Sequence, residues 1–162
     1  MDKNVIEAMN EQINLEMYSG YLYLNLSIQM ERLNYKGYSQ WLADHYFEEL
    51  SHAQDFIKYL QKRNVSASLL DIKVHNVSYK EPLDVAKAVL EHEKKVTQSI
   101  YKLHDLAKKY SDYATEIFLH GYISEQIEEE DIALGIIDKF TFAGDSTAAK
   151  YAVDREFVRT AG

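Results

Sequence analysis

The sequence has no cysteine, a single proline and six glycines among its 162 residues. Without cysteine there can be no disulfide, thiolate zinc site, iron–sulfur cluster or thiol nucleophile, so any metal must be bound by oxygen and nitrogen. Because proline and glycine interrupt helices, their scarcity permits long ones. Pro82 directly precedes the amphipathic segment LDVAKAVLEHEKKV, a position at which proline favours the first turn of a helix.

Two further absences concern the cellular location of the protein and its binding partners. No run of about 18 apolar residues is present, and the start MDKNVIEAMNEQ lacks the basic and apolar regions of a signal peptide. We therefore expect a cytoplasmic protein without a membrane partner. The 18 basic residues form no block and are outnumbered by 26 acids, for a net charge of −8. This balance disfavours nucleic-acid binding and favours attraction of cations.

The amphipathic pattern predicts an all-α protein, and the length predicts one domain spanning residues 1–162. Four segments have the length of bundle helices, and a shorter one follows them. The predicted helices cover residues 4–32, 38–62, 82–110, 113–142 and 147–159.

The connections between these segments predict the topology. The first and third are short, so the helices that they join form antiparallel hairpins. The middle one, of roughly 18 residues, can extend to roughly 60 Å, whereas a helix of about 26 residues is about 39 Å long. It can therefore cross the whole bundle and make the second and third helices parallel. Its apolar residues are expected to pack along the outside; they are Leu69, Leu70, Ile72 and Val74.

Ionisable residues interrupt the apolar seam of all four long segments near the middle. They are Glu16, Glu49, His52, Glu93, Glu125 and Glu129. In segment 113–142 the seam is Phe118, Tyr122, Glu125, Glu129, Ile132 and Ile136. If the helices pack side by side, these groups share one layer of the core. Several carboxylates cannot ionise together at low dielectric without a cation, so the pattern predicts a bound metal.

The residue types narrow the choice of metal. Glu49 and His52 form a Glu-x-x-His motif, which places a carboxylate and an imidazole on one helical face. Oxygen-rich ligands with one imidazole suit iron, manganese or zinc. In di-metal bundle sites two helices give one glutamate each, here Glu16 and Glu93, and Glu49 is the natural bridge. The second motif is altered to Gln-Ile-Glu-Glu at 126–129, which predicts a weaker second site bound almost wholly by carboxylates.

Each of these residues alone could reflect a misjudged helix face, and only the set of four interrupted seams favours a metal. Tyr23 lies on the seam about two turns from Glu16, where it could donate a hydrogen bond to a ligand or be oxidised. His45, one turn before Glu49, is a core residue or an outer partner of the site, and His92 is expected to point away from it.

Four segments resemble non-haem bacterial and archaeal ferritins. They are NEQINLEMYSGYLYL, FEELSHAQDFIKYL, LEHEKKVTQSIYKL and YISEQIEEE. The resemblance extends over essentially the whole chain. It implies a ferritin-like four-helix bundle with a long crossover and a short fifth helix, assembled as a homo-oligomeric shell of 24 subunits. It also implies ferroxidase activity, in which Fe(II) is oxidised by O2 or peroxide and stored inside as hydrated ferric oxide.

The same resemblance implies a di-iron centre and a third iron site beside it. The first iron site corresponds to Glu16, Glu49 and His52, and the second to Glu49, Glu93 and Glu129. The third, weaker site corresponds to Glu48, Glu125, Glu128 and Glu129. Gln126 matches a glutamine that flanks the centre, and Tyr23 matches a tyrosine near it.

Departures from related patterns refine the expectation. Gly121 stands where relatives can carry a tryptophan, so electron donation by tryptophan from that position is not expected. Haem is not expected either, because Leu50 occupies the position of the haem-binding methionine of bacterioferritins. Rubrerythrins need a cysteine-rich iron domain, and the small DNA-protecting relatives place their ligands between subunits. Two alternatives stay open from the residues alone: a di-iron or di-manganese oxidase of an organic substrate, and a helical scaffold without metal.

Overall fold

The computed structural model describes residues 1–74 and 77–159. Within these ranges the chain forms five helices and no strand, which confirms the all-α prediction. Each helix begins and ends within two residues of its predicted boundaries. The helices are α1 (Lys3–Arg32), α2 (Lys36–Lys62), α3 (Pro82–Lys109), α4 (Tyr113–Ala143) and α5 (Thr147–Arg159). None of them is long and apolar enough to cross a membrane.

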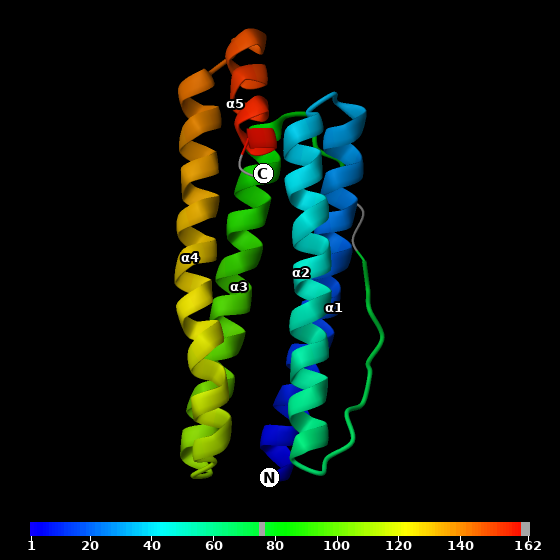
Figure 1. Ribbon diagram of the computed structural model, residues 1–162, viewed down its shortest axis with the longest axis vertical. Helices are drawn as coiled ribbons and strands as arrows, with labels where there is room; N and C mark the ends of the chain where they lie inside the picture. Colours follow the sequence, from blue (N-terminus) through cyan, green and yellow to red (C-terminus); the bar gives the residue numbers. More distant parts are fainter. Residues whose placement is uncertain (75–76, 160–162) are drawn as a thin grey trace.

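The topology follows the connection lengths. Short turns join α1 to α2 and α3 to α4 as antiparallel hairpins, and the long connection runs beside α1 from one end of the bundle to the other (Figure 1). The helices α2 and α3 are therefore parallel, as predicted. The α1 helix packs closely on α3, whereas no Cα atoms of α2 and α4 come within 8 Å in the described residues. Long side chains bridge this wider side of the bundle.

Local sequence signals set the ends of the helices. The Asp2 side chain accepts a hydrogen bond from the backbone N–H of Asn4 at 2.8 Å, and Asp112 caps α4 in the same way. Pro82 occupies the first turn of α3, as predicted. The turns after α1 and α2 place Asn34 and Asn64 at φ 70° and 57°, a left-handed conformation that asparagine tolerates well.

The hydrophobic core is divided into two clusters. One lies toward the end where α5 docks, and its members include Tyr23, Leu26, Met30, Leu42 and Phe140. The other lies toward the opposite end, and its members include Met9, Ile13, Phe56, Ile100 and Leu119. The six ionisable seam residues fall between the two clusters, and we call them the polar layer. Burial of apolar surface on both sides stabilises a bundle that carries these charges at its centre.

The α5 helix docks through a close backbone approach. A Cβ atom on Gly37 would lie 2.0 Å from the carbonyl oxygen of Asp154, so only glycine fits there. The Asp154 carboxylate accepts hydrogen bonds from the backbone N–H groups of Gly37 and Tyr38, at 3.2 and 2.8 Å. The Tyr38 and Phe157 rings stack at 4.9 Å between centroids. A residue from α5 thus caps the first turn of α2.

Part of the seam predicted for α4 was wrong. The buried residues of this helix include Leu119, Gln126, Ala133 and Phe140, whereas Ile132 is 43% exposed. Apolar side chains occur on more than one face of α4, so periodicity alone could not identify the face that packs on α3. Glu125 and Glu129 consequently lie at the edge of the buried face.

The expected packing of the crossover was also wrong in part. Leu69, Leu70 and Val74 are 65%, 48% and 41% exposed. Hydrogen bonds to α1 side chains hold the crossover instead. Gln29 donates to the Val77 carbonyl at 2.9 Å and accepts from the Tyr79 N–H at 2.7 Å.

Candidate metal centre

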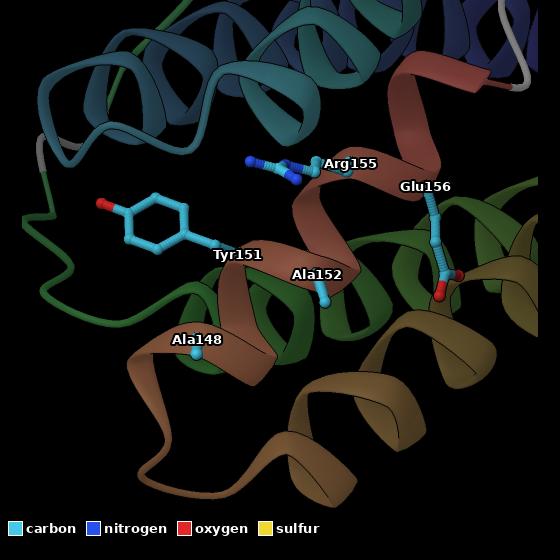
Figure 2. A pocket seen from close by; sticks show the side chains of 5 residues that line it. All are labelled: Ala148, Tyr151, Ala152, Arg155 and Glu156. Carbon is cyan, nitrogen blue, oxygen red and sulfur yellow. The ribbon is translucent and has the colours of Figure 1, made fainter.

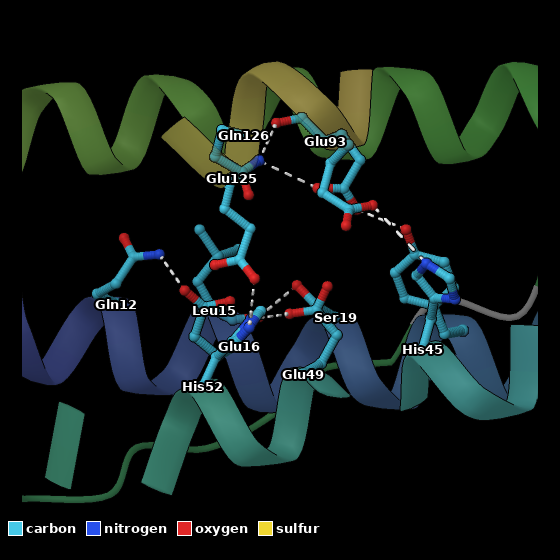
Figure 3. Close-up of polar contacts among 12 residues, drawn as sticks. Gln12, Leu15, Glu16, Ser19, His45, Glu49, His52, Glu93, Glu125 and Gln126 are labelled. Carbon is cyan, nitrogen blue, oxygen red and sulfur yellow. Dashed lines mark hydrogen bonds and ion pairs between the residues drawn. The ribbon is translucent and has the colours of Figure 1, made fainter. Parts of the chain in front are cut away.

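Glutamate and histidine side chains from all four bundle helices converge in the polar layer (Figure 3). The structure brings Glu16, Glu49 and His52 together so that one ligand atom from each lies within 4.8 Å of the others. Glu16 is only 1% exposed and Glu49 only 7%. This group coincides with the first site expected from the sequence.

The electrostatics of this group favour a cation. Burial and the neighbouring Glu49 raise the pKa of Glu16 well above its usual value. Burial also raises the pKa of Glu49, although His52 partly opposes the shift. Most telling is Oε2 of Glu16, which is buried without a hydrogen-bond partner. A buried acceptor of this kind is costly unless something binds it, and a metal ion would do so.

His52 joins the buried group to the wider side of the bundle. Its Nδ1 lies 3.5 Å from Oε2 of Glu49, and its Nε2 lies 3.2 Å from Oε1 of Glu125 on α4. Burial alone would lower the pKa of His52, but these two carboxylates raise it to about 11. A proton on His52 therefore balances part of the negative charge in the metal-free protein, and a metal ion would replace that proton.

Glu93 is held from two directions. The Tyr23 hydroxyl donates to its Oε1 at 2.6 Å, and the Gln126 amide donates to its Oε2 at 3.1 Å. Burial raises the pKa of Glu93, and these two hydrogen bonds partly oppose the shift. Burial and the nearby Glu93 raise the pKa of Tyr23 well above its usual value, so the phenol stays protonated and keeps donating.

Two further groups of potential ligands adjoin the first. Glu48 lies with His52 and Glu125, and again with His45 and Glu129, in each case within 4.8 Å between ligand atoms. The Nδ1 of His45 lies 2.9 Å from the Trp41 carbonyl, which can only accept, so Nδ1 carries the hydrogen. Burial lowers the pKa of His45, and its neutral Nε2 is directed at Glu129, 3.7 Å away. Burial and the charge of Glu93 raise the pKa of Glu129 to about 7.

Most of the predicted metal ligands lie in one of these groups of possible ligands, and two do not. The three groups contain Glu16, His45, Glu48, Glu49, His52, Glu125 and Glu129. Glu93 stands outside these groups, but it belongs to the polar layer, where its carboxylate accepts hydrogen bonds from Tyr23 and Gln126. Glu128 is exposed and belongs to none of the groups, so its role in a third site stays a prediction.

The sequence did not reveal two residues that support Glu16 through hydrogen bonds, Gln12 and Ser99. The Gln12 amide donates to Oε1 of Glu16 at 2.7 Å, and the Ser99 hydroxyl donates to Oε1 of Gln12 at 2.5 Å. The spacing of Gln12 and Glu16 by four residues was a usable signal, because it places both on one helical face. Ser99 gave no such signal, since its contact depends on how α3 packs against α1.

Other features lie apart from the polar layer. A hollow of about 570 Å³ runs along α5, and all five of its lining residues come from that helix (Figure 2). It holds one carboxylate and no imidazole. His92 is buried, with 5% of its surface exposed. Its Nε2 forms a 2.7 Å hydrogen bond with the Ser19 hydroxyl and does not face the carboxylates. The expectation that it points away from the site is met.

A four-helix bundle whose core carries converging glutamate and histidine side chains is the arrangement on which carboxylate metal sites of helical bundles are built. Residues 6–143 match the family Ferritin, described as a ferritin-like domain, and the chain belongs to this family. It is 40% identical over 139 residues to a bacterial non-heme ferritin of Bacteroides fragilis, covering 86% of this chain and 87% of the relative. It is 36% identical to the bacterial non-heme ferritin of Campylobacter jejuni, covering 96% of this chain and 93% of the relative.

Solved structures agree with this assignment. An open-pore ferritin from the hyperthermophilic archaeon Archaeoglobus fulgidus superimposes with a TM-score of 0.94 at 34% identity and covers 97% of both chains. A humanized archaeal ferritin gives the same TM-score at 36% identity, covering 97% of this chain and 96% of the other. The ferritin-like fold is thereby established, and membership of the non-heme ferritins implies iron as the metal.

Proposed function

We propose that this protein is a ferroxidase and iron store of the cytoplasm, which oxidises Fe(II) with O2 or peroxide and deposits hydrated ferric oxide inside a shell of 24 subunits. The observation that carries the proposal is the buried group of Glu16, Glu49 and His52, in which one Glu16 oxygen has no partner. Such a group binds a divalent cation through hard oxygen ligands and one imidazole.

The carboxylates and His52 would form two adjacent iron sites that share Glu49. Glu16, Glu49 and His52 would bind the first Fe(II), and Glu93, with Glu129 and the shared Glu49, the second. Two Fe(II) ions held side by side can each give one electron to the same O2, which takes it to the peroxide level without releasing a one-electron radical. Carboxylates stabilise the harder Fe(III) ion, and this preference favours oxidation.

The wider side of the bundle suits the exit of product. Glu48 is exposed and Glu125 partly exposed on the side of the bundle where α2 and α4 face each other, next to His52. Side chains that bind iron there, less enclosed than Glu16, would hold it less tightly. We infer that Glu48, Glu125, Glu128 and Glu129 form a third site through which Fe(III) passes toward the store.

Size-exclusion chromatography combined with aerobic Fe(II) titration tests the proposal. We expect a particle near 24 subunits that turns amber and retains far more than three irons per chain. A monomer or dimer that saturates at two irons would refute storage and favour an oxidase of an organic substrate. A protein that neither binds nor oxidises Fe(II) would leave only a helical scaffold.

A further inference from the structure

The two glutamates that α1 and α3 contribute to the polar layer are held in different ways. Both oxygens of Glu93 receive a hydrogen bond, one from Tyr23 and one from Gln126. Only Oε1 of Glu16 receives one, from Gln12, and its Oε2 stays buried and unpartnered. The protein therefore fixes which oxygen of Glu16 is available, and Gln12 is the group that does so.

The orientation of Gln12 is itself determined by the structure. An amide side chain can present either its oxygen or its NH2 group to a neighbour. The ionised Glu16 carboxylate can only accept, so the end of the amide that lies 2.7 Å from it is the NH2 group, and the oxygen faces the Ser99 hydroxyl, which donates to it at 2.5 Å. The Ser99 donor holds the amide oxygen in this orientation. Gln12 is fully buried, so water does not compete for either contact.

We propose that Ser99 and Gln12 form a positioning relay that holds Glu16 to a single metal-binding oxygen, Oε2, at the first iron site. The inference rests on the proposed function. Because Gln12 occupies Oε1, Glu16 would bind iron through one oxygen rather than both, which would leave room at the ion for the oxidant. Gln12 touches neither iron nor oxidant and acts only through Glu16.

Anaerobic titration of the metal-free protein with Co(II) tests the relay without relying on turnover. The d–d absorption of Co(II) is stronger at low coordination number, so it reports whether Glu16 binds through one oxygen or two. In Gln12→Met, whose side chain is similar in length and suits a helix, Oε1 loses its donor. We expect the first-site affinity to fall about ten-fold, the scale typical of lost outer partners of metal ligands, and the absorption to weaken.

Ser99→Ala provides a second variant that leaves Gln12 in place. Without the Ser99 donor the amide oxygen of Gln12 loses its partner and the side chain is held less firmly against Glu16, so we expect a change in the same direction but smaller. Ser19→Ala is the matched control. Ser19 is buried on the same helix and bonds His92 on α3, so its loss removes an α1–α3 hydrogen bond without touching Glu16. We expect its Co(II) affinity and spectrum to match those of the wild type.

The outcomes separate the relay from the function on which it rests. If Gln12→Met and Ser99→Ala bind Co(II) as the wild type does, with the same spectrum, the relay is overturned and the proposed function stands. If all three variants change alike, the effect is general loosening of the α1–α3 contact and the relay is again overturned. If the wild type neither binds Co(II) nor oxidises Fe(II), the proposed function fails and the relay fails with it.

Discussion

The Tyr23 hydroxyl donates a 2.6 Å hydrogen bond to Oε1 of Glu93 and so ties α1 to α3 across the polar layer. Tyr23 is 1% exposed, and its ring also packs 5.2 Å from the ring of His45 between centroids. One side chain therefore supports a carboxylate of the proposed second iron site and contacts a histidine next to it.

Tyr23→Phe should keep the fold and slow iron oxidation. The ring remains, but Glu93 keeps only the Gln126 donor, so we expect Fe(II) oxidation to slow about ten-fold in stopped-flow absorbance. Tyr38→Phe is the control, because the Tyr38 hydroxyl is buried without a hydrogen-bond partner. Its removal should be neutral or stabilising. Equal oxidation rates in the two variants would show that the Tyr23 hydroxyl has no role.

Glu49→Ala and His52→Ala should each slow the initial oxidation of Fe(II) by more than about ten-fold, since even outer partners of ligands have effects of that size. The metal-free bundles should stay folded for different reasons. Glu49→Ala removes one of the crowded carboxylates, and in His52→Ala, which loses the balancing positive charge, the remaining carboxyl groups can bind protons instead. Stopped-flow kinetics and urea unfolding measure the two effects. Glu7→Ala, which removes an exposed glutamate of α1, serves as the control. Unchanged initial rates in both ligand variants would refute the site assignment.

Asp112 should stabilise the fold in a pH-dependent way. It accepts hydrogen bonds from Arg63 at 2.9 Å and from the Thr115 N–H at 3.3 Å. Burial alone would raise the pKa of Asp112, but these donors and the Arg63 charge hold it below its usual value. Asp112→Asn keeps a capping side chain but loses the charge. We expect it to lower the free energy of unfolding at pH 7 by about 1–2 kcal/mol.

The sign of the pH dependence follows from the lowered pKa. Because the folded protein binds the Asp112 proton more weakly than the unfolded chain, the stabilisation is complete above about pH 4, the unfolded value. It disappears as the pH falls through the lower folded value. Urea unfolding of wild type and Asp112→Asn should therefore differ at pH 7 and converge in acid. A difference that is constant with pH would contradict the ion-pair explanation.

Two glycines should respond oppositely to alanine. A Cβ atom on Gly121, inside α4, would meet nothing within 4 Å beyond its chain neighbours and the nearby backbone of its own helix, so Gly121→Ala should stabilise the helix by about 0.5–1 kcal/mol. Gly37→Ala would place a Cβ atom 2.0 Å from the Asp154 carbonyl and should displace α5. Thermal unfolding of both variants checks this pair. A stable Gly37→Ala variant with α5 still docked would contradict the close approach.

The helices and the candidate ligands could be read from the chain because both depend on local spacing. Glu49 and His52 are three residues apart on one helix, so their shared face needs no tertiary information. The crossover between Lys62 and Pro82 is long enough to span the bundle, which determined that α2 and α3 run parallel. Glu16 and Glu93 each interrupt an otherwise apolar seam, which was sufficient to place them in the core.

Features that depend on contacts between helices could not be read in the same way. Apolar residues on several faces of α4 concealed that Gln126 is buried and Ile132 exposed, because only packing against α3 selects the face. The exposure of Leu69 followed from a crossover held by hydrogen bonds to Gln29 rather than by apolar burial.

The sequence by itself determined five helices, their order and a set of glutamates and one histidine at a common depth, since helical periodicity and connection length are properties of the chain. Only the tertiary structure decided which carboxylate oxygens of that set accept hydrogen bonds and which are left to bind a metal. Ser99 on α3 orients Gln12 on α1, and Gln12 occupies one oxygen of Glu16 and leaves the other unpartnered. Hydrogen bonds between helices are directional and act over about 3 Å, so they exist only once the helices are packed.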